Sequence, residues 1–125
     1  MMQKKVLIVD DSKLMRIIIK KILSNDDLFV VTGEAGNGIE ALSEIERDVP
    51  DIIFLDIEMP EMDGVEATRE IRQFLSKSDL PIIALTANVS LEDREACLKS
   101  GMNDFLTKPL NGEALDKTLE RWSRV

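Results

Sequence analysis

Polar side chains that could act together in chemistry follow four separate apolar runs of this sequence, at the point where each run ends. Taken alone, an aspartate in such a place is more often a turn former or a helix cap. Only the whole set, in this order along the chain, indicates a functional site. The set consists of three carboxylates, a hydroxyl and an ammonium: Asp10, Asp11, Asp56, Thr86 and Lys108.

Three carboxylates that share one pocket repel one another. A pair of like unit charges ~4 Å apart costs about 4 kcal/mol at an effective dielectric constant near 20. One lysine cannot offset three acids, whereas a hard divalent cation can, and an oxygen-only site suits Mg²⁺. The set therefore predicts a magnesium site beside which a carboxylate could receive a phosphoryl group, since the metal spreads the charge of the phosphoryl oxygens.

The composition excludes several other kinds of chemistry. The chain has no histidine, which rules out Ser-His-Asp and Cys-His catalysis, His-ligated zinc and a role as a phosphohistidine donor. Its net charge is −8 with scattered Lys and Arg, so we expect no direct binding to nucleic acid or to a membrane. Cys97 is the only cysteine and is expected to pack in the core. No signal peptide or membrane-spanning run is evident, and a cytoplasmic location is expected.

The elements that must position these residues alternate along the chain between short apolar runs and amphipathic stretches. This alternation predicts an α/β fold with a parallel sheet that helices cover on both faces. In a flavodoxin-like doubly wound sheet of order 2-1-3-4-5, all the polar strand ends would meet where the strand order reverses. Five strands are expected near residues 6–9, 29–31, 51–55, 81–86 and 104–107, and five helices over residues 12–24, 37–47, 65–76, 90–101 and 111–124.

The residues around these strand ends closely resemble the receiver domains of response regulators, the phosphoacceptor half of two-component systems. The resemblance covers essentially the whole chain, which implies one receiver domain over residues 1–125. It is strongest to chemotaxis-regulator-like receivers that stand alone or belong to hybrid sensor kinases. The matching strings are VDDS at 9–12, LDIEMPEMDG at 55–64, LTAN at 85–88 and GMNDFLTKPL at 101–110.

The resemblance implies a role for each matched position. Asp56 would be the phosphoacceptor, with Lys108 contacting the phosphoryl oxygens and Thr86 hydrogen-bonding one of them after transfer. Glu58 and Asn88 would flank the pocket and influence the lifetime of the phosphoryl group. The Mg²⁺ ligands would be Asp11, Asp56 and the backbone carbonyl of Glu58, with Asp10 assisting through a water molecule.

A conformational switch is also implied by the resemblance. Movement of Thr86 toward the phosphoryl group would vacate space that Phe105 could enter, and phenylalanine lacks the hydroxyl that many relatives carry there. The Lys108–Pro109 bond would be cis, which would direct the lysine inward. Ala87 matches the small residue that is preferred beside the phosphate.

The partners implied are a histidine kinase or a histidine phosphotransfer domain, which donates the phosphoryl group, and an unknown downstream protein. The helix expected after Ser12 carries more apolar residues than its core face needs, because Leu14 and Ile17 lie away from the main apolar stripe. Since this helix begins beside Asp11, we expect Leu14 and Ile17 to dock against a helical donor.

Two other functions remain open on the sequence alone. A phosphohydrolase that forms an aspartyl phosphate would use an acid two residues after the nucleophile, where Glu58 stands, but the Asp10-Asp11 pair and Lys108-Pro109 do not fit that class. A flavin-binding or purely structural module is the other possibility, although no Gly/Ser/Thr-rich phosphate loop follows the first strand. The receiver, which modifies only itself, is the favoured interpretation over an enzyme.

Overall fold

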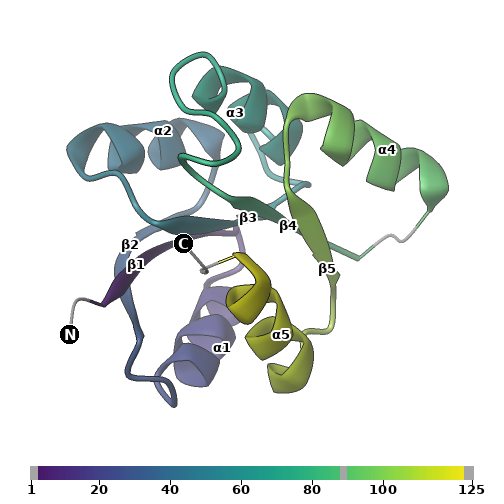
Figure 1. Cartoon of the computed structure of the whole chain (residues 1–125). Helices are drawn as coiled ribbons and strands as arrows, with labels where there is room; N and C mark the ends of the chain where they lie inside the picture. The colour runs from purple at the N-terminus through teal and green to yellow at the C-terminus, as the bar shows by residue number, and fades with distance from the viewer. Residues whose placement is uncertain (1–2, 88–89, 123–125) are drawn as a thin grey trace.

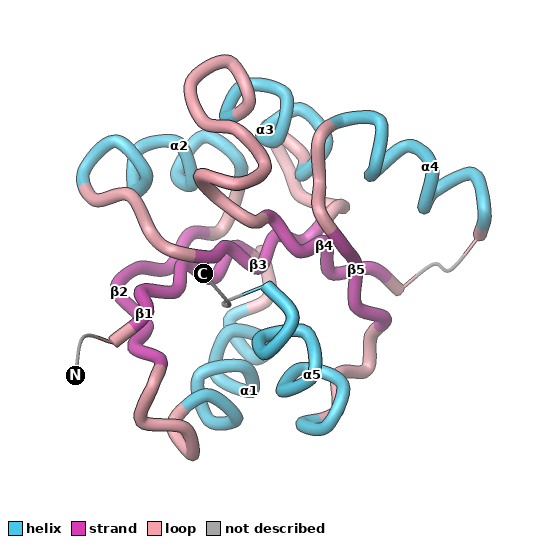
Figure 2. The backbone as a smooth tube through the Cα atoms, in the orientation of Figure 1, coloured by secondary structure: helices cyan, strands magenta, loops and turns pink. Residues whose placement is uncertain are grey.

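The five strands form one parallel sheet in the order β2-β1-β3-β4-β5, which confirms the predicted topology (Figures 1 and 2). The structure is a computed structural model that describes residues 3–87 and 90–122. The strands are β1 (Lys4–Val9), β2 (Phe29–Ala35), β3 (Ile52–Asp56), β4 (Ile82–Thr86) and β5 (Asp104–Thr107). The helices are α1 (Lys13–Leu23), α2 (Gly38–Arg47), α3 (Gly64–Ile71), α4 (Leu91–Ser100) and α5 (Gly112–Trp122).

The helices cover the sheet on both faces, with α1 and α5 on one side and α2, α3 and α4 on the other (Figure 1). Each face has its own apolar core. Ile19, Leu23 and Leu115 pack on the first side, whereas Ile45 and Ile71 pack on the second. Every residue of β3 and β4 is buried, as expected for parallel strands covered on both faces. Polar groups that follow these strands are therefore held on a rigid base.

Each of the five helices follows a residue whose side chain accepts the backbone N–H three positions along the chain. Ser12 and Ser90 do so for Met15 and Asp93. Such bonds satisfy backbone donors that have no partner within the helix. At the other end of α4, Gly101 has a φ of 113°, a left-handed conformation that glycine adopts readily and that ends the helix. The other three caps are Asn37 for α2, Asp63 for α3 and Asn111 for α5.

The prediction for the third helix was wrong at its end. The helix stops at Ile71 rather than at Ser76, because the following segment folds around the side chain of Arg72. The guanidinium of Arg72 donates hydrogen bonds to the backbone carbonyls of Leu75, Ser76 and Leu80. It also reaches Gly101 after α4, a contact that the local sequence could not reveal.

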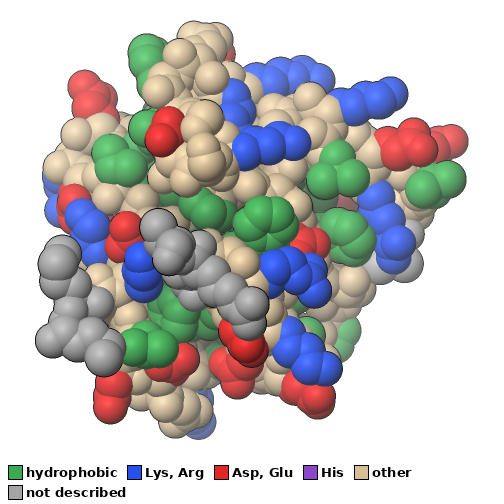
Figure 3. All heavy atoms as spheres, in the orientation of Figure 1, with side chains coloured by type: hydrophobic (Ala, Val, Ile, Leu, Met, Phe, Trp, Pro, Cys, Tyr) green, Lys and Arg blue, Asp and Glu red, His purple; other side chains and the backbone are tan. Residues whose placement is uncertain are grey.

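The last helix, predicted to reach Arg124, extends to Trp122, and Arg124 lies outside the described residues. Among the helices of residues 3–87 and 90–122, none is long and apolar enough to span a membrane. On the face shown in Figure 3, acidic and basic side chains are interspersed.

Candidate functional site

The polar residues predicted from the strand ends lie together at one edge of the sheet. Asp10 follows β1, Asp56 and Thr86 are the last residues of β3 and β4, and Lys108 follows β5. Because parallel strands end at the same edge, residues far apart in sequence meet there. One carboxylate oxygen from each of Asp10, Asp11 and Asp56 lies within 4.8 Å of the others. An open hollow of about 230 Å³ beside them is lined by Asp11, Asp56, Ile57, Glu58, Leu85, Thr86, Ala87 and Lys108.

Lys108 supplies the positive charge nearest to the acids. Its Nζ lies 3.0 Å from Oδ2 of Asp10 and 3.5 Å from Oδ1 of Asp56. Burial acts to lower the pKa of Lys108, but the carboxylates of Asp10 and Asp56 outweigh it and raise that pKa above its ordinary value. The Lys108–Pro109 peptide bond is cis, as predicted. The backbone N–H of Lys108 also donates to the carbonyl oxygen of Thr86, which joins the ends of β4 and β5.

Asp10 is completely buried, although Asp11 beside it is exposed. Oδ1 of Asp10 accepts the backbone N–H of Ser12 at 2.9 Å. Oδ2 forms the ion pair with Lys108, but no hydrogen bond of acceptable angle reaches this oxygen from the described residues. A buried carboxylate oxygen in this condition has room for a further partner, either a hydrogen-bond donor or a cation.

The pKa of Asp56 is strongly shifted by its surroundings. Burial, followed by the charge of Asp10, raises the pKa of Asp56 to about 7. Lys108 and the backbone N–H of Glu58 act in the opposite direction, and the latter lies 3.3 Å from Oδ1 of Asp56. The cost of ionising Asp56 next to Asp10 is therefore not fully offset by Lys108.

This perturbation predicts a pH-dependent stability for the metal-free protein. The pKa of Asp56 is about 7 when folded, against 3.8 for an ordinary aspartate. Between these values the folded state holds the proton more tightly, so the free energy of unfolding falls as the pH rises. We expect a decrease of about 2–4 kcal/mol from pH 4 to pH 8, measured by urea denaturation with a chelator present. In Asp56→Asn most of this slope should disappear, and an unchanged slope would contradict the assignment.

The donor set fits a hard divalent cation. Three carboxylates within 4.8 Å of one another provide only oxygen ligands, and Oδ2 of Asp10 still lacks a well-formed hydrogen bond. Asp11 is exposed and borders the hollow, so a cation that keeps several water ligands has space there. Glu58 also borders the hollow, and the role of its backbone carbonyl as a ligand stays a prediction.

The loop after β3 is held close to Asp56 by a glycine. The backbone N–H of Gly64 donates to the carbonyl oxygen of Ile57 at 2.9 Å. A Cβ atom at this position would lie 2.4 Å from the backbone oxygen of Asp56, so any other residue would force the start of α3 away from the site.

Of the other predicted residues, none that the structure describes lines this hollow apart from Ala87. Phe105 is half-buried on β5, and the guanidinium carbon of Arg94, from α4, lies 4.7 Å from the centre of its ring. Sequence reasoning missed this contact, because nothing in the local pattern pairs the two residues.

Leu14 and Ile17 are 66% and 49% exposed on α1, as predicted. Cys97 is buried, and Asn88 lies outside the described residues.

Comparisons with known proteins agree with the geometry. The sequence model of the response regulator receiver domain matches residues 6–120. A protein of Leptolyngbya boryana, named only as an uncharacterized 14.6 kDa protein in the sodA1 3′ region, is 39% identical over 120 residues, covering 96% of this chain and 90% of that protein. The chain spans only 14% to 33% of three other curated relatives, which are larger proteins.

Two solved structures are informative about ligands and partners. One is the receiver domain of the Pseudomonas aeruginosa PAO1 sensor histidine kinase PA1611, with a magnesium ion coordinated in its active-site cleft. It has a TM-score of 0.85 and 40% identity, covering 97% of this chain and 98% of that chain. The other is the receiver domain of Saccharomyces cerevisiae Ssk1 in complex with the histidine phosphotransfer protein Ypd1. Its TM-score is 0.85 at 34% identity, with coverage of 96% and 88%.

Proposed function

Because this chain belongs to the response regulator receiver family, the phosphoacceptor domains of two-component and phosphorelay signalling, we propose that Asp56 is the residue that accepts the phosphoryl group. The observation that carries this assignment is the position of Asp56 within 4.8 Å of two other acids and 3.5 Å from Lys108, beside an open hollow. Membership of this family favours a signalling phosphoacceptor over the phosphohydrolase. We also propose that residues 1–125 make up one receiver domain.

The chemistry proposed is one phosphoryl transfer. An oxygen of ionised Asp56 attacks the phosphorus atom of a phosphohistidine, the P–N bond breaks, and its electron pair stays on the departing imidazole. Lys108 would hold a phosphoryl oxygen as charge accumulates on it. Thr86 and the small side chain of Ala87 border the space that the phosphoryl group would occupy.

Mg²⁺ is the proposed cofactor. Asp11, Asp56 and the backbone carbonyl of Glu58 would hold it, with Asp10 assisting through water. When bound, a dication would offset the charge of the acids and of the incoming phosphoryl oxygens. Support comes from the donor set itself, and from the magnesium ion in the related PA1611 receiver.

The deciding experiment is the intact mass of the protein after incubation with acetyl phosphate, with Mg²⁺ or with a chelator. We expect the mass of one added phosphoryl group in the presence of Mg²⁺ and little or none without it. The label should be stable in acid and labile in base, as an acyl phosphate is. No mass gain with Mg²⁺ and a competent donor would contradict the proposal.

We propose that Thr86 and Phe105 transmit the modified state. A phosphoryl group adds about two negative charges and would attract the hydroxyl of Thr86. The space that Thr86 leaves would admit the ring of Phe105, which is half-buried against the core in this structure. Arg94 would have to part from the ring for this movement to occur.

The donor proposed is a histidine kinase or a histidine phosphotransfer domain, and the receiver of Ssk1 in its complex with Ypd1 supports this choice. Leu14 and Ile17 on α1 would dock against a helical donor, because α1 begins beside Asp11. A downstream protein, not yet identified, would read the phosphorylated state.

Replacing Ile17 with glutamate should slow transfer from a phosphorylated histidine phosphotransfer domain by about tenfold or more, because a charge would be buried in the interface. Phosphorylation by acetyl phosphate should not change. Leu91→Glu is the matched control, since Leu91 is equally apolar and 70% exposed on α4. Equal losses with both donors, or equal effects of the two variants, would contradict docking at α1.

A further inference from the structure

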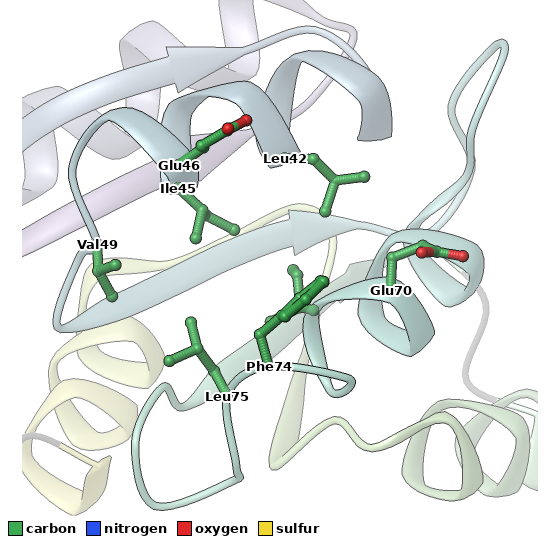
Figure 4. Close-up of a pocket in the computed structure, with 8 residues that line it drawn as sticks. Leu42, Ile45, Glu46, Val49, Glu70, Phe74 and Leu75 are labelled. Carbon is green, nitrogen blue, oxygen red and sulfur yellow. The ribbon is translucent and has the colours of Figure 1, made fainter.

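A second hollow, of about 470 Å³, lies between α2 and α3 (Figure 4). Apolar side chains form most of its lining, and two glutamates complete it. Its volume falls within the usual range of binding pockets, although the chemistry proposed above makes no use of it. The lining residues are Leu42, Ile45, Glu46, Val49, Glu70, Ile71, Phe74 and Leu75.

Two of the apolar residues that line this hollow are also exposed at the surface. Phe74 has the highest exposure of the large apolar residues of the described ranges, at 80%, and Val49 is 45% exposed. Phe74 follows α3 and stands free because the chain turns around Arg72 immediately after the helix. An exposed aromatic side chain beside an apolar hollow is typical of a surface that another protein covers.

Two carboxylates without a cation lie at this surface. Neither Glu46 nor Glu70 forms an ion pair or a side-chain hydrogen bond with the described part of the chain. Glu44, on the same helix as Glu46, is by contrast paired with Arg47. Glu46 comes from α2 and Glu70 from α3, so the two glutamates belong to opposite walls of the hollow (Figure 4). A partner with basic groups on both sides of an apolar stripe would complement them.

The hollow is distant from the phosphorylation site along the strand direction. It is lined by residues near the carboxyl ends of α2 and α3, whereas the acids lie where the strands end and the helices begin. The two hollows share no lining residue. A partner bound between α2 and α3 would therefore leave Asp56 open to its donor.

We propose that the hollow between α2 and α3 is a docking site for a basic amphipathic helix of a partner protein. Apolar side chains of that helix enter the hollow and cover Phe74, and Lys or Arg on its two flanks pair with Glu46 and Glu70. A second copy of this chain is a poor occupant, because the net charge is −8 and its own hollow presents the same carboxylates.

The test uses the full chain labelled with ¹⁵N and two synthetic helical peptides. One peptide has a stripe of Leu with Lys on both flanks, and the other has Glu in place of every Lys. We expect the Lys peptide to shift the amide signals of residues 42–49 and 70–75, and the Glu peptide to leave them unchanged. In the double variant Glu46→Lys/Glu70→Lys this preference should reverse. Labelling by acetyl phosphate should proceed unchanged with the peptide bound, so this test can fail while the proposed function holds.

Matched variants separate the apolar from the electrostatic contribution. Phe74→Ser should weaken binding of the Lys peptide about tenfold or more, because a large apolar contact is lost. Leu91→Ser, at an exposed apolar residue of α4, is its control. Glu46→Gln/Glu70→Gln should weaken binding by about three- to tenfold, as expected for two exposed ion pairs. The control Glu92→Gln/Glu95→Gln, on α4, makes the same change of charge and should have little effect on binding of the Lys peptide.

The proposal is overturned by absent binding at millimolar peptide, by equal binding of the two peptides, or by shifts centred on another helix. A dimer that Phe74→Ser dissociates in sedimentation would assign the surface to a second copy instead. If 4-phenylbutylamine saturates the same signals and the Lys peptide cannot displace it, the hollow would be assigned to small amines instead.

Discussion

Asp56→Asn should abolish phosphorylation by acetyl phosphate and by a phosphohistidine donor, while leaving the protein folded. The amide of asparagine is a far poorer nucleophile than a carboxylate, and it cannot form an acyl phosphate. The same substitution removes one of three clustered acids, and burial and Asp10 already disfavour the charged form of this one. We therefore expect the metal-free variant to be more stable than the parent at pH 8, by about 1–3 kcal/mol.

Intact mass and urea denaturation measure the two effects on the same sample. Asp116→Asn is a suitable control, because Asp116 is an exposed acid on α5 and its loss should alter neither labelling nor stability appreciably. A variant that still gains a full phosphoryl group would show that another residue is the acceptor. A loss of stability, in place of the expected gain, would mean that Asp56 contributes favourable interactions in its charged form.

Lys108→Met should destabilise the metal-free protein by about 2–4 kcal/mol at pH 8. The ammonium lies 3.0 Å from a completely buried oxygen of Asp10 and 3.5 Å from Asp56. Removing it leaves these carboxylates without their cation, and an uncompensated buried charge is costly. Methionine keeps most of the length of the side chain, so the change tests the charge rather than the packing. Phosphorylation should slow as well, since one phosphoryl oxygen loses its partner.

The control for this variant is Lys117→Met, which removes a lysine from an exposed pair. Lys117 lies 3.2 Å from Glu113, and the two side chains are 70% and 80% exposed. Such a pair contributes about 0.2–1 kcal/mol at most. Mg²⁺ should recover part of the stability lost in Lys108→Met, and it should stabilise Lys117→Met by the same amount as the parent, because the acidic cluster is unchanged there. Equal, small losses in both variants would show that Lys108 does not compensate Asp10.

The sequence by itself determined the order of elements and the set of residues at the candidate site. Buried parallel strands read as short apolar runs, and each polar residue that ends such a run must lie at the same edge of the sheet. Asp10, Asp56, Thr86 and Lys108 could be found in this way, because the rule depends only on the position of a residue within its own strand. Some helix ends also depend on nearby residues alone, as the caps Ser12 and Ser90 and the end of α4 at Gly101 show.

The tertiary structure alone decided how side chains from distant elements meet. Asp10 and Asp11 are neighbours in sequence, yet one is completely buried and the other exposed. Arg72 ends α3 early by binding carbonyls as far away as Gly101, and Arg94 meets Phe105 from another element. The hollow beside Phe74 likewise exists only because α2 and α3 pack against each other. A sequence pattern constrains residues within one helical turn or one strand. The contacts described here depend instead on how elements that are far apart in the chain pack together.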